Sequence, residues 1–166
     1  MRSRALFALS FSLAAAGCLR GLEDKRSLPP LDEAYFRCRV QPILTKDCSA
    51  LACHGSATRY YLVFARNRLR LGGTEAQRNA KLRDEERAFN FDAARAFVDQ
   101  GALDESLILL KPLEASEGGY YHGGATLFKK GNVFPNREDP DFKILAKWVH
   151  GEKEADQQCI EPGSDL

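Results

Sequence analysis

The chain has 166 residues, of which 44% are hydrophobic, and its 24 Lys and Arg nearly balance its 23 Asp and Glu. This length suits one domain, and the formal net charge of +1 gives no reason to expect binding to nucleic acid. Five cysteines and three histidines are the residues with the most distinctive chemistry.

The N-terminus has the pattern of a secretion signal. Arg2 and Arg4 precede an apolar run at residues 5–16, which is too short to span a bilayer as a permanent helix. The run ends in Ala-Ala-Gly-Cys and resembles a bacterial lipobox. That resemblance implies cleavage before Cys18 and attachment of acyl chains to it; ordinary cleavage with a spare Cys18 thiol is the alternative. We expect residues 1–17 to be a lipoprotein signal peptide.

Residues 18–31 are expected to form a lipid-anchored tether that is stiffened by a Pro-Pro pair, and residues 32–166 to form the folded domain. Several acyl chains anchor a protein firmly, since each buried methylene contributes about 0.8 kcal/mol. Leu19, not Asp, follows Cys18, and by the usual sorting rule for lipoproteins this favours the outer membrane. The expected location is the bacterial cell envelope, facing the periplasm.

The first helix is expected to begin near Asp32, whose side chain can cap it. Because proline has no N–H, Pro42 is expected to kink this helix or to start a fresh turn. The apolar side comprises Tyr35, Phe36, Val40, Ile43 and Leu44.

Directly after this helix, residues 48–55 read Cys-Ser-Ala-Leu-Ala-Cys-His-Gly. Two cysteines with an adjacent histidine form a widened version of C-x-x-C-H, the motif that attaches c-type haem. In that chemistry the thiols of Cys48 and Cys53 add to the porphyrin vinyl groups, and the imidazole of His54 binds the iron. The spacer is longer than usual, and we expect its small residues to let the loop bulge so that both sulfurs reach the porphyrin.

The same residues have other interpretations. Cys48 and Cys53 could form a disulfide in an exported protein. A zinc site usually needs a second pair of ligands, whereas His122 and His150 are far apart in the sequence. A cysteine nucleophile paired with His54 would leave the other cysteine unexplained. We therefore favour haem attachment.

The rest of the chain is expected to contain short helices and long irregular loops. Residues 60–71 alternate weakly and are expected to be extended or irregular. The other expected elements are a helix at 74–89 capped by Thr74, a helix at 90–98 capped by Asn90, a helix at 105–111 capped by Asp104, a loop at 114–136, and a final helix that is capped by Asp139, begins at Pro140 and ends at Gly151.

Methionine cannot be the second axial ligand of a haem iron, because the only methionine is Met1, which is expected to be removed with the signal peptide. His122 lies in Tyr-Tyr-His-Gly-Gly, whose glycines permit close approach of the backbone to a flat ligand. We expect His122 to bind the iron, with His150, a tyrosine, a lysine or water as alternatives. A His/His pair gives a lower reduction potential than His/Met.

Cysteine counting leaves one further pair. With Cys18 assigned to lipid and Cys48 and Cys53 to haem, Cys38 and Cys159 remain as plausible disulfide partners in an exported protein. A bridge between them would tie the first helix to the C-terminal tail.

Taken together, these motifs resemble the single-haem cytochrome c-like domains found in many exported proteins of planctomycetes and myxobacteria. The resemblance covers about residues 33–151 and implies a covalent haem, a cytochrome c-like helical fold and a redox role. Its motifs, in order, are Val40-Gln41-Pro42-Ile43-Leu44, the segment Cys48 to Gly55, Ser106-Leu107 with Lys111-Pro112, His122-Gly123-Gly124, and Trp148.

The sequence therefore predicts a small all-α domain around one covalent haem c. We expect a membrane-anchored electron carrier, not an enzyme, that exchanges single electrons with redox partner proteins. Two alternatives remain. One is a haem-free interaction module with a Cys48–Cys53 disulfide, and the other is a haem sensor or enzyme with an open iron site.

Overall fold

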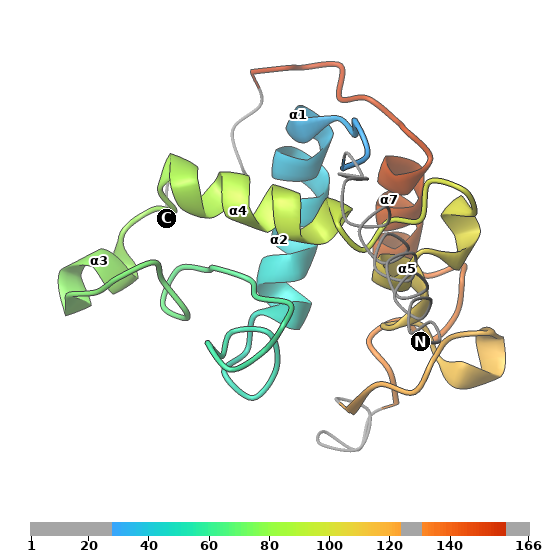
Figure 1. Cartoon of the computed structure of the whole chain (residues 1–166), viewed down its shortest axis with the longest axis horizontal. Coiled ribbons are helices and arrows are strands. Elements are labelled where there is room, and N and C mark those ends of the chain that lie inside the picture. Colours follow the sequence, from blue (N-terminus) through green and yellow to red (C-terminus); the bar gives the residue numbers. More distant parts are fainter. Residues whose placement is uncertain (1–27, 124–130, 159–166) are drawn as a thin grey trace, which may run out of the picture.

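The computed structural model of the chain describes residues 28–123 and 131–158, which form short helices joined by irregular segments (Figure 1). No strand occurs within these two ranges, where an isolated bridge joins Leu113 to Phe134. The predicted all-α class is thus confirmed for the described residues. No helix in this part of the chain is both long enough and apolar enough to cross a membrane.

The first helix is continuous and begins where the sequence predicts. Asp32 caps it, because its Oδ1 accepts a hydrogen bond from the backbone N–H of Tyr35 at 2.6 Å. The helix comprises α1 (Glu33–Tyr35), η1 (Phe36–Val40), α2 (Gln41–Ile43) and η2 (Leu44–Cys48).

Pro42 lies near the start of α2, between two wide π-helical turns, η1 and η2. In these turns a backbone N–H donates to the carbonyl five residues earlier, as Ser49 does to Leu44 at 3.1 Å. Wide turns accommodate a residue that lacks an N–H and whose ring crowds the preceding turn. The fresh turn expected at Pro42 is therefore a widened continuation of the same helix.

The prediction of one helix at 74–89 has the wrong boundaries. Thr74 does cap a helix, α3 (Glu75–Asn79), but the chain then leaves the helical conformation and resumes it in α4 (Asp84–Arg95). Asn90 lies inside α4, not at a helix start, and its side chain is buried. The Asn90 amide accepts from the N–H of Phe64 and donates to the carbonyl of Phe64, both at 2.8 Å. Its amide therefore forms hydrogen bonds with buried backbone groups of Phe64 and does not cap a helix.

Asp104 is likewise not a cap. It lies within the short helix η3 (Leu103–Glu105), and α5 (Leu107–Leu110) follows Ser106. The buried Ser106 hydroxyl accepts a hydrogen bond from the N–H of Asp99 at 3.0 Å and so closes the turn before α5.

The predicted start of the last helix, with its cap and its first residue, is confirmed. α7 (Pro140–Val149) begins with Pro140, and Asp139 accepts hydrogen bonds from the N–H groups of Asp141 and Phe142. The region expected to be a loop contains one short helix, η4 (Ala115–Glu117), and residues 124–130 lie outside the described residues.

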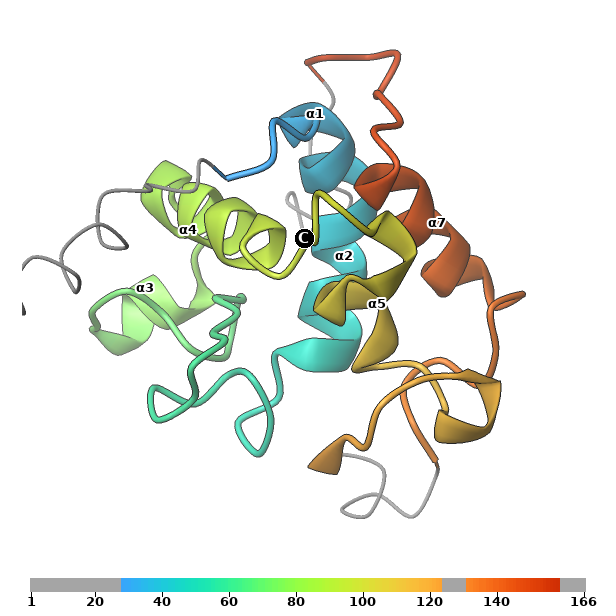
Figure 2. The ribbon, with the colours of Figure 1, turned by 45° about the vertical axis from the view of Figure 1, so that its right-hand side comes forward.

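Both α4 and α7 contact η1, and α5 contacts α7, so the first helix lies in the middle of the molecule (Figures 1 and 2). Three aromatic rings form the centre of the core: Phe36 lies 5.4 Å from Phe91 and 5.2 Å from Trp148, between ring centroids. The indole N–H of Trp148 donates to the carbonyl of Asp32 at 3.1 Å. This core fixes one end of the first helix, and the other end, η2, faces the loops that form the pocket described below.

The C-terminal tail packs on the first helix, as the disulfide prediction requires. Arg39 donates to the buried carboxylate of Glu154 at 2.7 Å, and Arg37 donates to the carbonyl of Gln157. Cys38 is disulfide-bonded. Its expected partner Cys159 lies outside the described residues, as do residues 1–27 with Cys18, so the pairing stays a prediction.

Candidate functional site

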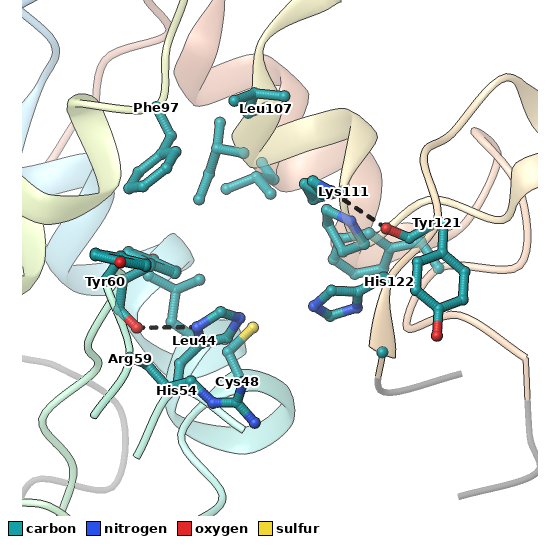
Figure 3. Close-up of a pocket in the computed structure, with 16 residues that line it drawn as sticks. Leu44, Cys48, His54, Arg59, Tyr60, Phe97, Leu107, Lys111, Tyr121 and His122 are labelled. Carbon is teal, nitrogen blue, oxygen red and sulfur yellow. Dashed lines mark hydrogen bonds between the residues drawn. The ribbon is translucent and has the colours of Figure 1, made fainter. Parts of the chain in front are cut away.

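A cavity of about 400 Å³ lies between η2, the loop that follows it, α5 and α7 (Figure 3). Ligand pockets of small molecules and cofactors usually have roughly 300–1,000 Å³. The walls are mostly apolar and include Leu44, Phe97, Ile108, Phe134 and Leu145. Cys48, His54 and His122 also line this cavity, which therefore gathers three of the residues that the sequence singled out.

The four-residue spacer of the cysteine motif forms a compact loop. The N–H of His54 donates to the carbonyl of Cys48 at 3.0 Å, so the chain returns to the end of the helix. Ser49 is buried, and its hydroxyl donates to the carbonyl of Thr45 at 2.6 Å. A Cβ at Gly55 would lie 2.0 Å from the carbonyl oxygen of Ser49, so only glycine fits. The expected flexible bulge is instead a tightly hydrogen-bonded turn.

His54 is held in one orientation by the segment after this loop. Its Nδ1–H donates to the backbone carbonyl of Tyr61 at 2.9 Å, and its own carbonyl accepts from Val63. Because a carbonyl can only accept, this bond places the proton on Nδ1 and leaves a lone pair on Nε2. Burial lowers the pKa of His54, and the nearby His122 and Arg59 lower it further. The neutral imidazole, which is the form that binds metals, is therefore favoured.

His122 lies near the end of the described range 28–123, in a segment that is anchored to α5. The N–H of Tyr120 donates to the carbonyl of Leu110 at 2.8 Å. A Cβ at Gly119 would lie 2.0 Å from the carbonyl oxygen of Leu113, so the close approach of the two segments requires glycine. Gly119 thus serves close backbone packing, whereas a Cβ at Gly123 would meet nothing within 4 Å, so the expected close approach of that glycine to a flat ligand stays a prediction.

The imidazoles of His54 and His122 project into the pocket from opposite sides (Figure 3). Their ring centroids are 5.9 Å apart, and their planes differ by 12°. The bond of His54 to Tyr61 uses Nδ1, so the Nε2 of His54 remains available. Two imidazoles on opposite sides of one metal, each with a nitrogen–metal bond of about 2 Å as for zinc, hold their centroids roughly 6 Å apart. The two rings are stacked, and the distance between their centroids matches that of two imidazoles that share one metal ion.

The two cysteines of the motif are both free thiols, so the alternative Cys48–Cys53 disulfide is not formed. Cys48 lines the pocket, whereas Cys53 does not. Burial raises the pKa of the Cys48 thiol to about 12. A nucleophilic cysteine needs a lowered pKa, so Cys48 does not have the character of the catalytic nucleophile considered above.

The rim of the pocket carries cationic and aromatic side chains. Arg59 and Lys111 line it, and each donates a hydrogen bond to a backbone carbonyl, Lys111 to that of Tyr121 at 3.2 Å (Figure 3). Tyr60 and Tyr121 also line it and are exposed, Tyr121 by 73%. The exposed part of the pocket lining therefore carries two positive charges, which suit a ligand that is apolar in its body and anionic at one edge.

His150 lies elsewhere. It is exposed, does not line the pocket, and its Nε2 contacts Asp104 at 2.9 Å. It is therefore not placed to act together with His54 in this pocket. Within residues 28–123 and 131–158, no three His, Cys, Asp or Glu side chains gather around a point that could hold a metal ion. Haem needs fewer protein ligands, since porphyrin nitrogens supply the rest.

Two residues near the site, Tyr61 and Asn132, gave no signal in the sequence. Tyr61 contributes only its backbone carbonyl and a ring that packs between His54 and Phe97, with centroids 4.8 and 5.1 Å away. Asn132, which belongs to the second described range, acts on His122 through a side-chain hydrogen bond. An aromatic cluster or an asparagine in a loop has many structural roles, so residue type alone could not assign these.

Comparison with known proteins adds no identification: the chain matches no protein-family model, no curated protein and no solved structure.

Proposed function

We propose that this chain is a c-type cytochrome with a cytochrome c-like fold, which carries one covalent haem and transfers single electrons. The observation that carries the proposal is the pair of facing imidazoles, 5.9 Å apart, inside an apolar cavity lined by Cys48. His54 and His122 would hold the iron, and Cys48 and Cys53 would hold the porphyrin. When bound, haem supplies an iron that takes up and releases one electron.

The residues of the chain fit that group in four respects. The cavity is mostly apolar, as the porphyrin face requires. Both imidazoles favour the neutral form, because burial lowers the pKa of each. The thiol of Cys48 lies at the pocket wall, and the cations of Arg59 and Lys111 at its rim would neutralise the two propionates.

The role of the protein in such a carrier is to hold the two ligands still and to exclude water. The backbone bond from His54 to Tyr61 fixes one ring, and the packing of α5 and α7 closes the pocket behind both. The exposed Tyr60 and Tyr121 lie where a redox partner would approach. We further propose export and lipid anchoring through Cys18, on the pattern of the N-terminal residues.

The two alternatives have less support. A haem-free module stabilised by a Cys48–Cys53 disulfide conflicts with the free thiols. A sensor or enzyme needs an open iron site, whereas His122 occupies the side of the pocket opposite His54.

The test is expression of the full chain in bacteria with and without a cytochrome c maturation system, followed by denaturation and mass spectrometry. We expect the mass of the chain to increase by one haem only when the maturation system is present. The matched control is Cys48→Ala/Cys53→Ala, which should carry no covalent haem. A wild-type chain that carries no haem under either condition refutes the proposal.

A further inference from the structure

The neighbourhood of His122 contains two buried polar atoms without a conventional partner: Nδ1 of His122 itself and Oδ1 of Asn132. A buried polar atom that lacks a partner is costly, so each such case calls for an explanation. The two side chains are in contact, since Asn132 acts on His122 through a side-chain hydrogen bond. One of the two atoms can donate and the other can accept, so they are complementary.

The orientation of the Asn132 amide follows from its other contacts. Its Nδ2 donates to the carbonyl of Leu113 at 2.7 Å and to the carbonyl of Tyr120 at 3.4 Å. A carbonyl can only accept, so the NH₂ end of the amide must face these two groups and Oδ1 must face the other way. The backbone N–H of Asn132 donates to the carboxylate of Glu114 at 2.8 Å, which fixes the position of the residue as well.

We infer that Asn132 is a positioning residue for His122: its Oδ1 accepts the Nδ1–H of His122 and so directs an unprotonated Nε2 into the pocket. The inference rests on the proposed function, which makes His122 an iron ligand. It gives both histidines the same tautomer, because the carbonyl of Tyr61 does the same for His54 at 2.9 Å. Ligand histidines in proteins generally donate their second N–H to an acceptor of this kind, which orients the ring and raises its basicity.

The arrangement also explains why Asn132 suits this position. The residue must donate to two carbonyls and accept from one imidazole, and an amide does both at once. Aspartate would keep the acceptor and lose the donors, and leucine would lose both. The two substitutions therefore separate the two roles of the side chain.

The test measures the reduction potential and the visible spectrum of the haem-loaded full chain for Asn132→Leu and Asn132→Asp. A stronger acceptor gives the ligand more anionic character and stabilises ferric iron. We expect Asn132→Asp to lower the potential and Asn132→Leu to raise it, with partial loss of the low-spin spectrum. If Asn132 only held the loop, both substitutions would loosen His122 and raise the potential, and that result overturns the inference.

Asn136 provides the matched control, because its Oδ1 accepts from the N–H of Glu138 and it does not line the pocket. Asn136→Asp adds the same charge without facing His122, and we expect a smaller shift than for Asn132→Asp. An equal shift of the reduction potential in both variants would show that the added charge alone causes it, and this would refute the inference.

A measurement on the wild type covers the case in which the variants do not fold. With ¹⁵N-labelled histidine, His122 should show a proton on Nδ1 that exchanges slowly with solvent. A proton on Nε2, or fast exchange at Nδ1, contradicts the inference. Failure of the proposed function is a separate outcome, because the wild type would then carry no covalent haem. In that case the ¹⁵N labelling still measures which nitrogen of His122 carries the proton in the haem-free chain.

Discussion

The chemistry of the site is decided by hydrogen-bond partners that are themselves not reactive. A histidine is a competent metal ligand only when the correct nitrogen is free, and a backbone carbonyl settles this for His54. Similarly, the two cysteines of the motif are equivalent in the sequence, yet only Cys48 lines the pocket. The difference arises because Cys48 ends the helix that forms the pocket wall, whereas Cys53 lies within the turn that follows.

The unequal positions of the cysteines lead to a prediction about haem attachment. Cys48→Ala should lower the amount of covalently bound haem more than Cys53→Ala does, because Cys48 is the thiol at the pocket wall. Mass spectrometry of the denatured, matured variants measures this directly. Retention of haem in Cys48→Ala together with its loss from Cys53→Ala would contradict the expectation.

Substitution of His122 tests the second axial ligand. His122→Ala should convert the low-spin visible spectrum of the haem-loaded protein to a high-spin or water-bound form, because His122 faces His54 across the pocket. His150→Ala is the control, since this exposed residue contacts Asp104 and lies outside the pocket. An unchanged spectrum of the His122 variant would show that another group binds the iron.

At the scale of the elements, a buried ion pair joins the irregular segment after the site to α4. The side chains of Arg70 and Glu86 are 5% and 0% exposed, and they lie 2.7 Å apart. Arg70 also donates to the carbonyls of Ala80 and Lys81, so it holds the connection between α3 and α4 in place. Burial alone would raise the pKa of Glu86. Hydrogen bonds from Arg70 and from the N–H groups of Arg83 and Leu71 outweigh it and lower the pKa to about 2.

The lowered pKa of Glu86 predicts acid sensitivity. Because the pKa in the folded state lies below the ordinary value of 4.5, the unfolded chain binds the proton first as the pH falls. The stabilisation is complete above about pH 4.5 and is lost as the pH falls toward 2. Urea unfolding between pH 7 and pH 2.5 should show this loss in the wild type and a flatter dependence in Glu86→Gln.

The same substitution should be costly at neutral pH. It leaves the Arg70 guanidinium buried without its partner, and breaking a buried pair in this way costs about 3–5 kcal/mol of unfolding free energy. Asp84→Asn is the matched control, because Asp84 is 93% exposed in its pair with Arg87 and should change stability little. Equal effects of the two substitutions would show that the buried pair has no special role.

At the scale of the whole molecule, the core and the pocket occupy opposite ends of the first helix. Phe36, Phe91 and Trp148 pack at one end without a ligand, whereas the other end borders a cavity of about 400 Å³ with apolar walls. An apolar cavity of this size loses packing contacts when nothing fills it. Stability at the pocket end is therefore expected to depend on the bound group.

This dependence can be measured by comparing the haem-loaded and haem-free full chains. Burial of apolar surface contributes about 25 cal/mol per Å², so filling the pocket should contribute several kcal/mol. Since 1 kcal/mol shifts Tm by about 2–4 °C in chains of this size, the loaded form should melt roughly 10 °C higher. Calorimetry of both forms tests this, with His150→Ala as a control that should keep the difference. Equal Tm values would show that the cavity does not hold the haem.

The sequence by itself determined the features that depend on neighbouring residues. Asp32 and Asp139 cap their helices because the N–H groups that they accept from are three residues away or fewer. The cysteine-histidine motif at 48–55 likewise singled out Cys48 and His54, which both line the pocket.

Only the tertiary structure decided the rest, because the relevant partners are distant along the chain. Asn90 satisfies the buried backbone of Phe64, so its tendency to cap helices gave a false boundary. The meeting of His54 with His122, and the contact of His122 with Asn132, depend on how α5 and α7 pack against the first helix. Short-range preferences predicted the starts of the first and last helices, whereas long-range packing decided which side chains share the pocket.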